Sequence, residues 1–344
     1  MKRRVLTVLL AVCLVFALGT VTAFADETVA TVNGTDYESL EAAIGAAGDG
    51  DTVQLTADIS VDAVITINTS ITLDLNGHII TNNVAGDSTF CVTASSFTVD
   101  GTAAGSGMSI PENNSGSYGF IKVADTSAVT LNGGTYSGNT DNGAFVKIFC
   151  DNDVDASGST VIFNNVTMTS NNRFFSTDTL ATGSDTPTLQ VSGGIYTTTG
   201  QAFGVDVLYA STVTFTNATV TAGTGPCIEV CGPAATFENC AFTVTGTNSN
   251  GFGTTAVAVS YGGTAVIDGG SYSAEKGYGI YAYSSGGTIN VVSGTITGGT
   301  AAARADVDRN TYSSAVSTVN ITGGTINGSL QTSNDDNANI VVTG

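Results

Sequence analysis

Three alternating carboxylates stand at Asp151, Asp153 and Asp155. This arrangement supplies the hard oxygen ligands that calcium prefers. The segment lacks the glycine at the sixth position and the glutamate at the twelfth that an EF-hand loop carries. We interpret it as a solvated acidic turn, keep calcium as the alternative, and expect no other cofactor. If the chain cleaves a sugar, these residues with Asp185 or Asp206 are the first carboxylates to test.

Lys122, Lys147 and Glu229 are each the polar residue within a short apolar run. Alternation along a strand turns such a residue outward, so the three side chains could project from one lateral face. With Tyr209 they form our candidate ligand-binding set, against the alternative that they are solubilising charges. Ring faces for stacking on sugars are available from Tyr209, Tyr261, Tyr281 and Tyr283. Alternation must place some of these rings in the core, and we expect no catalytic residue among the candidates.

Cysteine and histidine spacing does not favour zinc. Cys227 and Cys231 have no second pair at ligand spacing, and His78 is the single histidine. Five cysteines follow the export signal described below, and an odd number cannot all pair internally. We expect one disulfide at most and buried apolar roles for most of the five, which are Cys91, Cys150, Cys227, Cys231 and Cys240.

Hydroxyl residues recur at two alternating positions along the chain. One series is Thr81, Ser137, Thr169, Thr197, Thr221, Thr243, Ser273 and Thr297, and the other is Thr135, Thr167, Thr219, Ser271 and Thr295. A flat array of threonines resembles the binding face of some ice-binding β-helices. Threonine is also favoured on any exposed strand, and the uneven repeat length argues against a flat, lattice-matched surface. We keep ice binding as a minor alternative.

The element that must position these residues is a repeat, found ten times, of the form apolar, x, apolar, x, Gly/Asn/Ser, x, x, apolar. Its second positions lie 22 to 32 residues apart, too short for a four-stranded propeller blade. Two apolar residues at i and i+2 face one side of a strand, and glycine or asparagine allows the chain to bend after them. The copies begin at Leu73, Phe97, Val129, Val161, Leu189, Val213, Ala235, Ala265, Ile289 and Val319.

A third strand precedes several copies, at 90–92, 120–123, 145–148, 227–230, 256–259 and 280–283. A single coil cannot bury its apolar residues alone, so equivalent positions must stack into a continuous core. The sequence therefore predicts an all-β fold, a right-handed parallel β-helix of about eleven coils. The pattern at Ile340, Val342 and Gly344 begins a last coil, and we expect the β-helix of 51–344 to be truncated there.

The N-terminal part carries an export signal and a cap. A basic start, an apolar run and Ala23-Phe24-Ala25 indicate a signal peptide over 1–25. Thr35-x-x-Glu38 is a capping-box pattern, and apolar residues at helical spacing follow it. We therefore expect an N-terminal strand and a short capping helix within 26–50, with the helix covering the open end of the β-helix.

The excess of acidic residues limits which partners the chain can bind. Without the signal peptide, six basic residues face 29 acidic ones. Nucleic acid and anionic membranes are poor partners for such a chain, because phosphate contacts need clustered lysine and arginine. We expect no membrane insertion after signal cleavage, and a monomer or a part of a longer chain.

The segment 37–81, YESLEAAIGAAGDGDTVQLTADISVDAVITINTSITLDLNGHIIT, resembles the entry of pectate-lyase-like β-helix modules in secreted and surface proteins of Gram-positive bacteria. The downstream repeats look similar to the same class. The resemblance implies a pectin-lyase-like fold, shared by polysaccharide lyases, glycoside hydrolases and adhesin-like proteins. The acidic and basic residues of the enzymes have no counterpart here that can be matched residue by residue, and a fold alone does not define an activity.

We therefore expect a secreted, adhesin-like module that binds a glycan or a surface protein without cleaving it, attached to the cell through sequence beyond Gly344. The alternative is a polysaccharide lyase or glycoside hydrolase.

Overall fold

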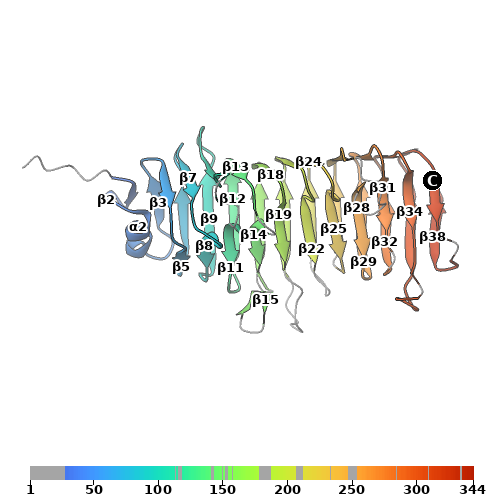
Figure 1. The fold of residues 1–344 in the computed structure, drawn as a ribbon, viewed down its shortest axis with the longest axis horizontal. Helices are drawn as coiled ribbons and strands as arrows, with labels where there is room; N and C mark the ends of the chain where they lie inside the picture. Colours follow the sequence, from blue (N-terminus) through green and yellow to red (C-terminus); the bar gives the residue numbers. More distant parts are fainter. Residues whose placement is uncertain are drawn as a thin grey trace, which may run out of the picture.

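The computed structural model is a long rod of stacked coils (Figure 1). It describes residues 28–112, 114, 118–140, 143–148, 150–151, 154–156, 158–177, 187–206, 212–232, 234–246, 254–283, 285–308, 310–333 and 335–344. The segment 1–25, predicted to be a signal peptide, lies outside these residues, as do Asp153, Asp185 and Tyr209.

Three long sheets run along the rod, and each complete coil contributes one strand to each. Sheet A contains β2 (Thr35–Tyr37), β1 (Ala30–Val32), β3 (Thr52–Leu55), β6 (Ile71–Asp74), β9 (Ser96–Gly101), β12 (Ala128–Gly133), β17 (Thr160–Asn164), β20 (Thr188–Ser192), β23 (Thr212–Thr216), β26 (Ala234–Glu238), β29 (Gly263–Asp268), β32 (Gly287–Val291), β35 (Ser317–Ile321) and β38 (Ala338–Val342).

Sheet B contains β4 (Ile59–Val61), β7 (Ile79–Asn82), β10 (Gly107–Ser109), β13 (Thr135–Gly138), β18 (Thr167–Ser170), β21 (Ile195–Thr198), β24 (Thr219–Ala222), β27 (Ala241–Val244), β30 (Ser271–Ala274), β33 (Thr295–Gly298) and β36 (Thr325–Asn327). Sheet C contains β5 (Ile65–Ile67), β8 (Ser88–Val92), β11 (Gly119–Val123), β14 (Ala144–Ile148), β19 (Arg173–Thr177), β22 (Phe203–Asp206), β25 (Ile228–Cys231), β28 (Thr255–Ser260), β31 (Tyr278–Ala282), β34 (Ala301–Ala305) and β37 (Leu330–Thr332).

The predicted parallel β-helix is confirmed. Eleven strands in sheet B and eleven in sheet C define eleven three-stranded coils within the described residues, and β38 adds a further strand to sheet A. The pairings of β3 through β38 in the three sheets are parallel and in register. The coil of β3, β4 and β5 precedes the ten copies of the sequence repeat, and its first corner, at Ala57, has no glycine or asparagine to reveal it.

The first two apolar positions of the repeat fill the core from sheet A, and the fourth fills it from sheet B. Leu73, Val99 and Leu131, for example, are fully buried. The second copy is an exception, because Ala104 lies exposed in a turn and Met108 stacks between Ile80 and Tyr136 instead. The corner between Gly101 and Gly107 is longer in this copy, so the residue that points into the core from sheet B comes later in the repeat.

Aromatic rings stack through the centre of the rod. Phe120 and Phe145 lie 4.7 Å apart between ring centroids, and Phe203 and Phe215 lie 4.9 Å apart. Contacts of this kind continue in both directions, and each adds about 0.5–1.5 kcal/mol beyond the burial of the rings. The stack is formed by Phe120, Phe145, Phe174, Phe203, Phe215, Phe237, Phe242 and Tyr272.

Left-handed backbone forms most of the corners, as the Gly/Asn position predicts. Asn165, Asn217 and Asn239 have φ of 51°, 56° and 51°, while Gly193 and Gly269 occupy the same position with φ of 68° and 82°. These are the residue types for which such a φ costs least. The asparagine side chains also occupy the space beside these glycines. A Cβ at either glycine would overlap Oδ1 of the asparagine in the preceding coil.

The helix at the N-terminal end is α2 (Leu40–Ala46), shown at the start of the rod in Figure 1. Leu40, Ala43 and Ile44 are buried and pack into the core of the rod. The capping box predicted at Thr35 is wrong. Thr35 begins β2, which pairs with β1, and the N-cap is Ser39, whose Oγ accepts from the Ala42 N–H at 3.1 Å.

Replacing Gly269 with alanine tests whether this corner requires glycine. The Cβ would strain a φ of 82° and overlap Asn239, so the free energy of unfolding should fall by about 1–3 kcal/mol. Gly45→Ala is the matched control, because Gly45 lies in α2 with open space around its Cα and alanine favours the helix by about 1 kcal/mol. Chemical denaturation measures the free energy of unfolding of both variants. Equal values would show that this corner does not require glycine.

Candidate ligand-binding face

One outward column runs along sheet C. The strand register places Lys122 directly beside Lys147. Glu229 lies in the same column three coils further on, about 14 Å from Lys147 at the spacing of neighbouring strands. The prediction that these three residues share a lateral face therefore agrees with the structure. We call this the sheet C column, formed by Thr66, Cys91, Lys122, Lys147, Ser176, Gly204, Glu229, Ala258, Tyr281, Arg304 and Gln331.

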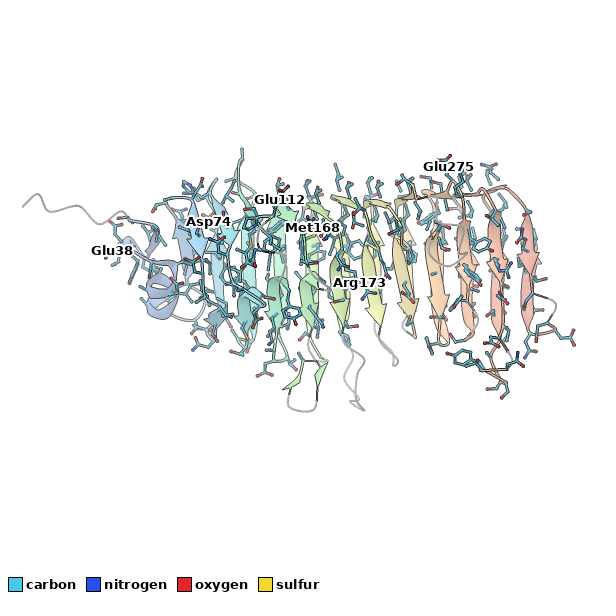
Figure 2. The ribbon with its side chains drawn as sticks, in the orientation of Figure 1. Glu38, Asp74, Glu112, Met168, Arg173 and Glu275 are labelled. Carbon is cyan, nitrogen blue, oxygen red and sulfur yellow. The ribbon has the colours of Figure 1, made fainter. Side chains whose placement is uncertain are left out.

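Cations gather on this face. The described part of the chain contains five basic residues, and Lys122, Lys147 and Arg304 belong to the sheet C column. Arg173 starts β19 and points toward the same face, near the middle of the rod in Figure 2. Lys276 alone lies elsewhere, in a turn between sheets B and C. Among the described residues of this acidic protein, four of the five basic side chains therefore lie on this face.

A glutamine joins the charges in the middle of the face. Gln201 Oε1 accepts from Arg173 Nη2 at 2.9 Å, and Gln201 Nε2 donates to Glu229 Oε2 at 2.9 Å. Cys231 Sγ donates to the other carboxylate oxygen of Glu229 at 3.5 Å. The three polar side chains are half-buried. Because both carboxylate oxygens are engaged, Glu229 is held in one orientation at a solvent-accessible surface.

An aromatic cluster occupies the same face toward the C-terminal end. The rings of Tyr278 and Tyr281 lie 5.0 Å apart, and those of Tyr281 and Tyr283 lie 5.3 Å apart. The guanidinium of Arg304 lies over the first two rings, at 5.4 and 5.7 Å from their centroids. Tyr281 is only 5% exposed as a result. As expected for some of the four tyrosines, Tyr281 therefore offers no free ring face to a sugar.

Asp306 completes this cluster. Its Oδ2 accepts from Arg304 Nη2 at 2.7 Å and from the Tyr281 hydroxyl at 3.1 Å. Burial by itself raises the pKa of the Asp306 carboxyl, but the hydrogen bond and charge of Arg304, together with hydrogen bonds from Tyr281 and Ser333, outweigh it and hold that pKa below its usual range. Burial raises the pKa of Tyr281, and the negative charge of Asp306 adds to the effect. The carboxylate therefore stays ionised and the phenol stays protonated.

The acidic segment forms a small hairpin on one edge of the rod (Figure 1). Its strands are β15 (Cys150–Asp151) and β16 (Val154–Asp155), which pair antiparallel. The side chains of Asp151 and Asp155 lie outside the described residues, as does Asp153, so calcium binding there stays a prediction. Across the described part of the chain, no three His, Cys, Asp or Glu side chains are grouped closely enough to hold a metal ion.

The outer face of sheet B carries the hydroxyl residues. Register joins ten consecutive strands into one hydroxyl column, and a second, partly interrupted column runs beside it through Thr135 and Thr167. The uneven repeat length does not disturb the column, because the extra residues lie in corners between sheets. The hydroxyl column is Ser60, Thr81, Ser109, Ser137, Thr169, Thr197, Thr221, Thr243, Ser273 and Thr297.

Three residues of the sheet C face lack a clear sequence signal. Arg173 starts a strand in which Phe174 and Phe175 are both buried, which breaks the alternation that would reveal it. Arg304 lies in the run Ala-Ala-Ala-Arg-Ala, whose small side chains resemble no core strand. Aligning all third strands by their single polar residue could have found Arg304. Gln201 precedes its strand and carries no such signal.

The fold and this face define a class, a parallel β-solenoid with a charged and aromatic lateral surface. Comparison with models of known protein families, with curated proteins and with solved structures finds no match for the chain. Within the described residues, no helix has the length and apolar character needed to cross a bilayer.

Four cysteines are described as free thiols, and Cys227, Cys231 and Cys240 are buried while Cys91 is half-buried. Burial raises the pKa of Cys227 to about 12 and that of Cys240 to about 11. For Cys91, burial raises the pKa and the nearby charge of Lys122 only partly offsets it. The buried positions agree with the expected apolar role.

Native alkylation tests this assignment. Among these four thiols, iodoacetamide should label Cys91 first, and faster as the pH rises, because the thiolate is the reactive form. Cys227, Cys231 and Cys240 should react only after unfolding. Peptide mass spectrometry reads each site, and labelling of Cys227 in the folded protein at a rate equal to that of Cys91 contradicts the assignment.

Proposed function

We propose that this chain is an extracellular, adhesin-like binding module that holds a glycan along the sheet C column. The observation that supports the proposal is the gathering of four of the five described basic residues on one side of an otherwise acidic rod. Export through the segment 1–25 and membership of the pectate-lyase-like modules of Gram-positive surface proteins belong to the same proposal.

The chemistry of the face suits a carbohydrate polymer. Strand spacing of about 4.8 Å gives the sheet C column a length of about 48 Å over its eleven positions. Lysine ammonium groups offer donors, and the carboxylate of Glu229, held in place by Gln201, offers acceptors to hydroxyl groups along that length. An extended chain can contact several coils at once, so weak contacts add to a useful affinity.

A second candidate function is supported by the hydroxyl column. Ten consecutive strands place serine or threonine in register on sheet B, and the strands are spaced regularly. Such a surface could order water, as the threonine faces of ice-binding β-helices do. We keep this function behind glycan binding because the sheet C column offers a greater variety of chemistry.

A polysaccharide panel tests the leading proposal. The double variant Lys122→Ala/Lys147→Ala should bind the recognised glycan about tenfold more weakly, a loss of about 1.4 kcal/mol. Lys276→Ala is the matched control, because that cation lies off the face, and its affinity should be unchanged. Equal binding by the double variant and the wild type would exclude this face as the ligand site.

The same panel tests for catalysis, and calorimetry tests for calcium binding. If the protein releases reducing ends or unsaturated products from a polysaccharide and Asp153→Ala abolishes their release, the chain is a hydrolase or lyase and the non-catalytic proposal fails. Calorimetry at millimolar calcium, repeated on a variant lacking Asp151 and Asp153, shows whether the acidic hairpin binds the ion. Binding to a surface protein and to no glycan would change the ligand class.

Thermal hysteresis tests the second candidate. If sheet B binds ice, Thr197→Lys/Thr221→Lys should abolish hysteresis, because the long side chains interrupt the hydroxyl column. Thr214→Lys, on the outer face of sheet A, should leave it intact. The absence of hysteresis in the wild type ends this alternative.

A further inference from the structure

Tyr261 has a backbone conformation that tyrosine rarely adopts. Six non-glycine residues in the described part of the chain have positive φ; five are asparagines, and the sixth is Tyr261, at 51°. Asparagine tolerates this region because its short side chain bonds locally to the backbone, whereas a bulky residue there is an outlier. Strained residues of this kind concentrate at functional sites.

The turn at Tyr261 and Gly262 is otherwise ordinary. Its φ values of 51° and 76° match those of Asn33 and Gly34, at 51° and 77°. The next coil holds it in place, because the Tyr261 N–H bonds to Ser285 Oγ at 3.0 Å and the Gly262 N–H bonds to the Gly286 carbonyl at 2.9 Å. Asparagine would therefore fit the backbone better than tyrosine does.

The tyrosine ring is not used to fill the core. Tyr261 is 47% exposed, and its ring meets Tyr312 edge to face at 5.8 Å between centroids. The two hydroxyls are 3.1 Å apart. Tyr312 comes from the segment between β34 and β35, where its N–H bonds to the Asp308 carbonyl at 2.7 Å. Two coils thus bring a pair of rings together on the surface.

A shallow depression of about 510 Å³ lies beside this pair. Gly262 and Gly286 contribute backbone without side chains, which allows close approach of a ligand. The hydroxyl-bearing residues Thr311, Ser313 and Ser314 line it together with Val316, which is 51% exposed. None of the described residues that line it carries a charge. The size is within the range of small-ligand sites.

We propose that Tyr261 and Tyr312 form a subsite for the pyranose ring of a neutral glycan. A pyranose presents a face of C–H groups that packs on an aromatic ring, while its equatorial hydroxyls reach out at the edge. The tyrosine pair supplies the apolar surface and the serine and threonine hydroxyls supply hydrogen-bond partners. The described lining residues are uncharged, which favours a neutral sugar over a uronate. This subsite rests on the proposed glycan-binding function.

The Tyr261→Asn variant separates function from stability. Replacing a strained tyrosine with the residue that suits the turn should leave the melting temperature unchanged or raise it. The same change removes one of the two rings of the stacking surface and the partner that orients Tyr312, so calorimetry with β-1,4-linked hexasaccharides of glucose, mannose and xylose should show affinity reduced at least fivefold. Tyr118→Ala is the matched control, because Tyr118 is 43% exposed but lies in a distant coil.

Three results would overturn the subsite. They are unchanged hexasaccharide affinity in Tyr261→Asn, a large drop in its melting temperature, and failure of the wild type to bind any of the neutral hexasaccharides. In the third case, Lys122/Lys147-dependent binding of an acidic polysaccharide would retain the proposed function while removing this subsite. Loss of binding in Tyr118→Ala as well would indicate a general effect of removing exposed rings.

Discussion

The structure depends on one constraint, the stacking of equivalent inward side chains from coil to coil. A coil of three short strands has no interior of its own, so each apolar side chain must rest on its counterpart above and below. The ring stack from Phe120 to Tyr272 is the clearest instance. Parallel register follows from it, because a shift of one residue would turn the apolar set outward.

Corners and outer faces follow from the same stacking. Equivalent corners must bend in the same way, and this places Asn165, Asn217 and Asn239 one above the other with Gly193 and Gly269, each glycine making room for the asparagine before it. Outward residues also fall into columns. A single polar residue in a strand thereby gains neighbours that are far away in the sequence, such as Lys122 and Lys147 or Tyr281 and Arg304.

Periodicity predicts the core and most of the corners because each depends on a few adjacent residues. It places Leu73, Val99 and Leu131 inward and identifies Asn165 as a bend. It fails where a longer corner moves the position, as at Ala104, and where a local pattern competes, as at Thr35. For the candidate site, the shared face of Lys122, Lys147 and Glu229 can be predicted from alternation. The bonds from Arg173 through Gln201 to Glu229 cannot, because they join three coils whose offset depends on the lengths of the intervening corners.

The direction of the backbone hydrogen bonds has a mechanical consequence. In all three sheets these bonds run along the rod, so tension along its axis loads each boundary between coils in series. Within one boundary, the three sheets share the load. The shortest described pairing in sheet C joins β19 and β22 through only two residue pairs, at Phe175–Phe203 and Ser176–Gly204. Under axial tension, a rod of this construction would extend by opening at one such boundary while the coils on either side keep their shape.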